Sequence, residues 1–185
     1  MLRTQPNPLA DLNAQLRQAV TATSRHRQLA ICAHEIGHAL LELAGGGDVR
    51  YVELRFKLTG LAGYCHYGDD AHDAEQLGWS GERKLARQIA TMAGHAAEVR
   101  FCQHYLGMDH SAAFRYGLDW AEGDYTDFYY FRRKFGLRHI SPDWAFHRAG
   151  IYLDRHGGLL DRLTLRLHHA HHVNGGAFPP PAGVQ

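Results

Sequence analysis

A helix of about twenty residues, from Arg25 to Ala44, carries the pattern that most constrains how this chain can fold. Its apolar residues recur at helical spacing and form one stripe, made of Leu29, Ala33, Ile36, Leu40 and Leu43. Three glycines at 45–47 end the run. This periodicity and its stop signal predict an amphipathic helix that packs its apolar stripe against the rest of the fold.

The same helix contains the pattern H-E-x-x-H, as His34-Glu35-Ile36-Gly37-His38. Because positions four apart lie on one helix face, His34 and His38 can each aim an imidazole nitrogen at a single cation. Two imidazoles and an oxygen ligand suit Zn²⁺, and Glu35 can act as a general base beside the cation's open position. The alternative is a histidine-rich surface helix, since the chain contains 15 His.

Composition limits the other classes of function. A chain of 185 residues is one domain with or without tails, and 45% hydrophobic and 21% charged residues are typical of a soluble globular protein. The net charge of +1 gives no reason to expect nucleic acid or an anionic membrane as a partner. The three cysteines are widely spaced and form no C-x-x-C, which fits a reducing compartment. Without a signal-peptide core or a long apolar run, we expect a cytoplasmic protein with no membrane segment.

The rest of the pattern predicts a mostly helical α+β fold with a small sheet. Residues 52–58 alternate apolar and charged, as in a half-buried strand, and residues 61–67 are expected to form a second strand. Further helices are predicted over 82–106, from 124 to before Gly136, from Ser141 to 156, and over 159–169, with loops over 68–78 and 107–123. We expect a lead-in at 1–24, one domain at 25–178 and a disordered proline-rich tail at 179–185.

With these elements assigned, the chain resembles the peptidase domain of the FtsH family of membrane-anchored, ATP-dependent zinc proteases. Four stretches carry the resemblance in order, and it extends more weakly to Phe178. They are the A-H-E-I-G-H-A-L segment at 33–40, G-L-A-G-Y at 60–64, A-G-H-A-A-E at 93–98 and G-D-Y-T-D-F at 123–128.

The resemblance implies a zinc metallopeptidase of FtsH type. Zn²⁺ would be held by His34, His38 and Asp127, with Glu35 as the catalytic base. Three alternatives to Asp127 as third ligand remain open: Asp124 in the same segment, Glu98 from the next helix, and Cys65 in a His₂Cys site. The resemblance favours a role for Glu98 in orienting a ligand. The strand containing Leu61, Ala62, Gly63 and Tyr64 would bind substrate by strand addition.

Three departures from the family pattern are visible. The ATPase module and membrane anchors are absent, residues 99–122 contain an insertion, and Thr126 replaces an Asn. We therefore expect ATP-independent cleavage of unfolded or flexible polypeptide, with a separate ATPase as a possible partner. The main alternative is a peptidase-like binding or regulatory module with little turnover. A metal-dependent hydrolase of a small non-peptide substrate is a third possibility. The oligomeric state, and the roles of the insertion and of the histidines at 168–172, stay open.

Overall fold

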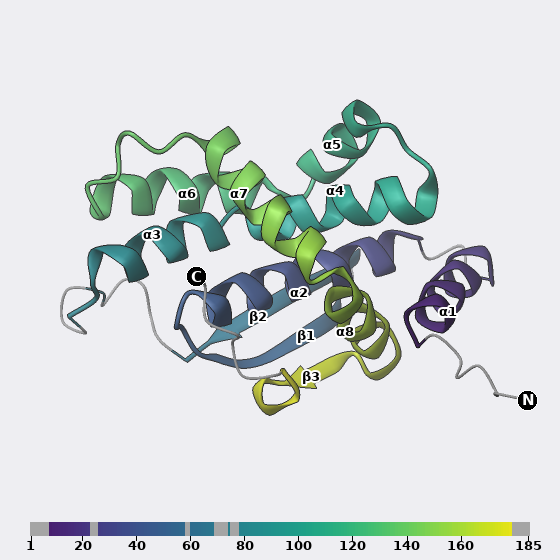
Figure 1. Cartoon of the computed structure of the whole chain (residues 1–185). Coiled ribbons are helices and arrows are strands. Elements are labelled where there is room, and N and C mark those ends of the chain that lie inside the picture. Colours follow the sequence, from purple (N-terminus) through teal and green to yellow (C-terminus); the bar gives the residue numbers. More distant parts are fainter. Residues whose placement is uncertain (1–7, 23–25, 58–59, 69–73, 75–77, 179–185) are drawn as a thin grey trace, which may run out of the picture.

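The computed structural model describes residues 8–22, 26–57, 60–68, 74 and 78–178. Within them the chain forms eight α-helices, one three-stranded antiparallel sheet and a short 3₁₀ helix (Figure 1). This confirms the predicted mostly helical α+β fold. The predicted tail at 179–185 and most of the loop at 68–78 lie outside the described residues.

The elements follow the chain in this order: α1 (Pro8–Ala22), α2 (His26–Ala44), β1 (Val49–Lys57), β2 (Gly60–Tyr67), α3 (Gly81–Ala90), α4 (Ala93–Leu106), α5 (His110–Leu118), α6 (Glu122–Lys134), α7 (Pro142–Arg155), α8 (Gly157–Ala170), β3 (His172–Asn174) and η2 (Gly175–Ala177).

Helix α2 lies in the middle of the molecule, between the sheet on one side and α3 and α4 on the other (Figure 1). It also contacts α7 and α8. Four of the five residues of the predicted apolar stripe are buried and Leu43 is partly buried, and burial extends to polar positions such as Gln28 and Glu42. The helix that carries H-E-x-x-H is therefore the central element of the core and not a surface helix.

Strand order in the sheet is β2-β1-β3, so β2 forms an edge. Strand β1 pairs antiparallel with β2, with Leu54 opposite Gly63. The predicted alternation holds in the first half of β1, where Val52 and Leu54 are buried while Arg55 is exposed. It is wrong for Phe56, which was expected on the buried face and is 61% exposed. Among the described residues, no strand pairs with the outer edge of β2. That edge can accept an added strand.

Two expectations about the helices are wrong. The single helix predicted over 82–106 is two helices, because the chain breaks at Thr91 and Met92 between α3 and α4. The segment at 107–123, expected to be irregular, contains α5, which Asp109 caps by accepting a hydrogen bond from Ala112 N at 2.8 Å. Short helices between glycines lack the long periodic pattern from which a helix is predicted.

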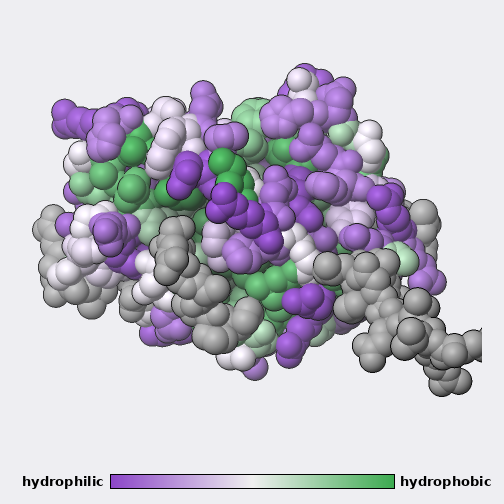
Figure 2. Space-filling model, viewed as in Figure 1, coloured by the Kyte–Doolittle hydropathy of each residue, from purple (hydrophilic) through white to green (hydrophobic). Residues whose placement is uncertain are grey.

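The N-terminal lead-in contributes to the core. Within α1, Leu12 and Leu16 are buried and pack in a second apolar cluster with residues of α2, α4 and α8. None of the helices in the described part of the chain combines the length and the apolar character needed to cross a bilayer. On the face seen in Figure 2, polar residues cover much of the surface with apolar patches between them, as expected for helices that bury one side.

The contact between α2 and α4 is close because Gly37 has no side chain. A Cβ added at Gly37 would lie 2.6 Å from both the Ala93 carbonyl oxygen and the Ala97 Cβ. Gly37→Ala should therefore lower the free energy of unfolding by about 1–3 kcal/mol, because overpacking outweighs the gain in helix propensity. Urea unfolding of the metal-free protein measures the change.

Gly150→Ala is the matched control. Gly150 is also helical, within α7, and a Cβ there would meet nothing within 4 Å. This variant should be unchanged or stabilised by up to about 1 kcal/mol. Equal effects of the two substitutions would contradict the packing argument.

Candidate metal site

Three side chains from two helices converge beside α4. His34 and His38 lie on one face of α2, and Asp124 lies in the first turn of α6. The Nε2 atoms of the two histidines are 3.2 Å apart. Asp124 Oδ1 is 3.1 Å from His38 Nε2, and Asp124 Oδ2 is 3.4 Å from His34 Nε2. In the described part of the chain, this is the one group of three or more His, Cys, Asp or Glu residues whose ligand atoms all lie within 4.8 Å of one another.

These spacings fit a small tetrahedral cation. A tetrahedral centre with ligands at about 2.0–2.1 Å has ligand atoms about 3.3–3.4 Å apart. The distance between the two histidine nitrogens is 3.2 Å, and the distances from these nitrogens to the two oxygens of Asp124 are 3.1 and 3.4 Å. All three are close to this value. Two imidazoles and one carboxylate leave a fourth position for another ligand. The donor set and its spacing are those of an open zinc-type centre.

Two further observations support a bound ion at this point. A Cβ added at Gly94 of α4 would overlap the Nε2 atoms of both His34 and His38, so a glycine keeps open the space that faces them. Asp124 Oδ2 is buried and accepts no hydrogen bond from the described residues. A buried carboxylate oxygen without a donor is costly unless a cation lies beside it, either a protonated His34, whose Nε2 is 3.4 Å away, or a bound metal ion.

The outer nitrogen of each histidine is held by a different kind of partner. His38 Nδ1–H donates to the Ala90 carbonyl at 2.8 Å, and Ala90 is the last residue of α3. His34 Nδ1 lies 3.3 Å from Glu98 Oε2, and Glu98 is fully buried. Both contacts leave Nε2 as the nitrogen that faces the candidate site. A histidine that binds a metal usually donates its other ring N–H to a carboxylate or a backbone carbonyl, as both do here.

Asp124 and the histidines shift one another's pKa. Burial alone would lower the pKa of His34 and His38, but the nearby carboxylates together, with Asp124 contributing most, outweigh burial and raise the pKa of both. Burial alone would raise the pKa of Asp124, but the two histidines hold it well below its usual range. The carboxylate is therefore ionised at neutral pH, and protons compete with a cation for the two imidazoles.

Glu35 lies between this group and the edge strand. A Cβ added at Gly63 of β2 would overlap the Glu35 side chain, so the strand passes directly over the carboxylate. Burial raises the pKa of Glu35; the histidines oppose this shift, and the carboxylates of Asp124 and Glu98 add to it. A carboxylate with a raised pKa beside an open cation position suits proton transfer near neutral pH.

Most of the predicted site residues are brought together, with one correction. His34, Glu35 and His38 lie as predicted, and the strand at 61–64 passes beside them with its residues partly exposed. Asp127 is exposed, and Asp124, one turn earlier in α6, completes the group. In the structure, the carboxylate three residues before the predicted Asp127 is the one that faces the two histidines.

Glu98 and Cys65, each a possible third ligand from the sequence, lie outside the group around Asp124. Glu98 contacts the outer nitrogen of His34, as the resemblance implied, and does not face the cation position. Cys65 lies on the face of β2 that packs against the core, and burial raises the pKa of its thiol. The third residue of the candidate group is therefore Asp124.

Two contacts were missed by the sequence reasoning. Arg27 Nη1 lies 2.6 Å from Glu98 Oε1, and the Ala90 carbonyl holds His38. The sequence does predict that Arg27 lies on the same face of the helix as His34, because residues seven apart share a helix face and Arg27 precedes His34 by seven. The Ala90 contact had no signal, since it depends on the break between α3 and α4.

Comparisons with known proteins add no assignment: a scan against models of protein families finds no match, and a search of curated proteins finds no relative.

The two aspartates of α6 give a direct test of the group. Asp124→Ala should weaken zinc binding by at least about 100-fold, because it removes a carboxylate that faces both imidazoles. Asp127→Ala should change it by less than about threefold, since an exposed side chain outside the group contributes little. Competition with a chromophoric chelator measures both affinities, and the reverse order would restore the register predicted from sequence.

Zinc binding should weaken as the pH falls. Because the pKa of both histidines is raised in the metal-free protein, a cation must displace protons from them below and around neutral pH. Without metal, the protonated histidines stabilise the fold below the unfolded pKa of about 6.5, and this contribution is lost as the pH rises through the raised folded values. The shift in unfolding midpoint on adding zinc should therefore grow from about pH 5.5 to 8.5. A shift independent of pH would contradict this account.

Proposed function

We propose that the protein is a zinc-dependent endopeptidase that cuts extended polypeptide segments. The observation that carries this proposal is the geometry of the group: two imidazole nitrogens and one carboxylate at 3.1–3.4 Å spacing, with Glu35 adjacent and an open strand edge beside it. A metal group without a base would suit storage or structure, whereas a base beside an open cation position suits hydrolysis.

His34, His38 and Asp124 would hold the ion. When bound, a zinc ion supplies Lewis-acid polarisation of a substrate carbonyl and stabilisation of the negative charge that develops on its oxygen. Glu35 would accept a proton from the attacking water and return it to the leaving amine. Its partly buried position and raised pKa favour this exchange of one proton in both directions.

A substrate segment would lie along β2. The outer edge of that strand is unpaired among the described residues, and Gly63 brings the strand backbone against Glu35. A peptide that adds to the edge through main-chain hydrogen bonds is extended, and its carbonyls pass close to the base. Such binding recognises the backbone of the substrate and depends little on the identity of its side chains.

The proposal extends to an FtsH-type fold. It is supported by the order of the elements: the zinc-motif helix, an edge strand beside the base, a helix carrying Glu98, and a later helix that supplies an aspartate. The chain contains no G-x-x-x-x-G-K motif, so cleavage by the chain itself would not use ATP. A separate ATPase would be the partner for folded substrates.

The decisive experiment compares the wild-type protein with Glu35→Gln on casein or a peptide library, with and without a chelator. Wild-type cleavage should need the metal, and Glu35→Gln should keep zinc while losing about 10²–10⁴-fold in rate. Full activity in Glu35→Gln would exclude the proposed base. Tight zinc binding with no cleavage of any peptide would favour a binding or regulatory module instead.

The state of the substrate should control the rate. A folded domain resists strand addition by its own stability of about 5–15 kcal/mol, so only unfolded segments should be cut fast. One substrate protein, offered in its folded form and as a destabilised variant, should be cut much faster in the second form. Equal cleavage of both, or stimulation of the purified chain by ATP, would show this expectation to be wrong.

A further inference from the structure

The buried carboxylate of Glu98 is shared between a candidate ligand and an arginine. Its Oε2 faces His34 Nδ1 at 3.3 Å, and its Oε1 accepts a hydrogen bond from Arg27 Nη1 at 2.6 Å. Glu98 is fully buried, and a buried carboxylate is stable only when polar partners such as these two satisfy its oxygens. Arg27 and His34 come from the same helix, two turns apart, and Glu98 from α4 lies between them.

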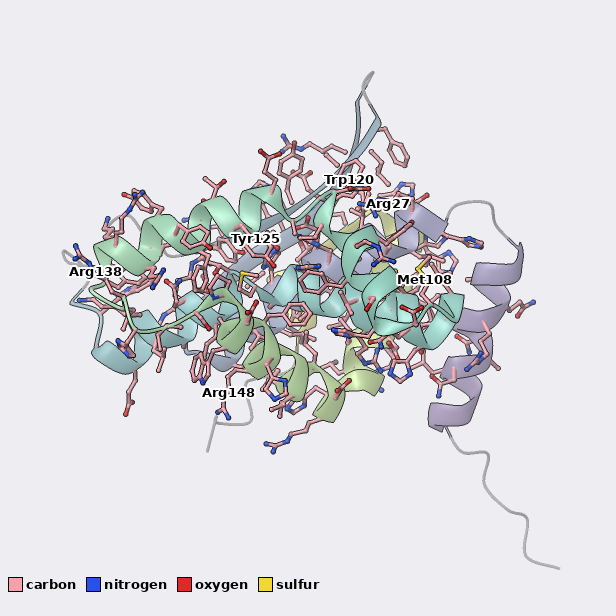
Figure 3. The ribbon with its side chains drawn as sticks, turned by 90° about the horizontal axis from the view of Figure 1, so that it is seen from above. Arg27, Met108, Trp120, Tyr125, Arg138 and Arg148 are labelled. Carbon is pink, nitrogen blue, oxygen red and sulfur yellow. The ribbon has the colours of Figure 1, made fainter. Side chains whose placement is uncertain are left out.

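Arg27 is itself held by the segment that follows α4. Its guanidinium lies over the rings of Trp120 and Tyr116, at 4.4 Å and 4.8 Å from the ring centres. Figure 3 shows Arg27 and Trp120 side by side where α2 begins. The other guanidinium nitrogens, Nε and Nη2, are buried and have no hydrogen-bond partner among the described residues. The two rings and Glu98 therefore set the orientation of the arginine.

The two histidines differ in what holds them. His38 is oriented by a backbone carbonyl, which no side-chain substitution removes. His34 is oriented by a chain of side chains that begins at Trp120 and passes through Arg27 and Glu98. A substitution at Trp120, Arg27 or Glu98 should therefore disturb the orientation of His34 and leave that of His38 unchanged.

We infer that Arg27 is a positioning residue for the metal site. It fixes the Glu98 carboxylate so that His34 Nδ1–H donates to it, which keeps the Nε2 lone pair directed at the cation. Trp120 and Tyr116 hold the guanidinium in turn, so the segment between α4 and α6 supports the metal site from outside it. The inference rests on the proposed zinc site but not on peptidase activity.

Zinc affinity of the full chain, measured with zinc alone against a chromophoric chelator, tests this inference. Arg27→Gln should weaken binding by about 10–100-fold, the usual cost of losing a partner that orients a ligand. Arg27→Lys, which keeps a cation beside Glu98, should recover most of the loss. Trp120→Leu leaves the ion pair but removes the larger ring contact, and it should weaken binding by about 3–10-fold.

Arg100→Gln is the matched control. Arg100 Nη1 lies 2.8 Å from the buried Asp161, in an ion pair of the same kind on the same helix as Glu98, but outside the group around Asp124. This variant should lose stability and keep its zinc affinity. An equal loss of affinity in Arg100→Gln, or none in Arg27→Gln, would overturn the inference.

The remaining outcomes separate the inference from the proposed function. If Arg27→Gln does not fold, Trp120→Leu decides, and unchanged affinity there would overturn the inference. Weakened zinc binding in a protein that cuts no peptide would support the positioning role and reject the peptidase. Failure of the wild-type chain to bind zinc would reject both.

Discussion

The close packing of α2 against α4 is the constraint on which the rest of the structure depends. Gly37 and Gly94 remove the side chains that would otherwise hold the two helices apart, and a Cβ at either position would collide with the opposite helix. The close contact between α2 and α4 that buries the apolar residues of α2 also places α4 against the two histidines. Core packing and the metal geometry are therefore two consequences of one helix contact.

Burying polar groups in this contact requires that each has a partner. The Ala90 carbonyl is available to His38 because α3 ends at that residue, and helix ends leave carbonyl groups without intrahelical partners. Glu98 is contacted on both oxygens, by Arg27 on one and by His34 on the other. One oxygen of Asp124 lacks a hydrogen-bond donor among the described residues, and it faces the position proposed for the cation. The polar contacts around the two histidines are thus incomplete at the point where an ion would bind.

The sheet places an edge strand beside the candidate site. Strand β2 lies at the edge of the sheet and passes over Glu35, the proposed base, at a glycine, and no strand of the described residues pairs with its outer edge. An edge of this kind is normally protected, because it invites pairing with other chains. Its position beside a base and a candidate metal group gives the exposed edge a use that a purely structural sheet would lack.

The sequence by itself determined the central helix, the edge strand and most of the candidate site, because these depend on local periodicity. His34, Glu35 and His38 follow from spacing within one helix, and the strand β1 follows from the equally local alternation around Val52 and Leu54. The break between α3 and α4, the helix α5 and the choice of Asp124 over Asp127 do not. Both aspartates lie on the same helix one turn apart, and only the angle at which α6 meets α2, set by packing of distant segments, decides which carboxylate reaches the histidines.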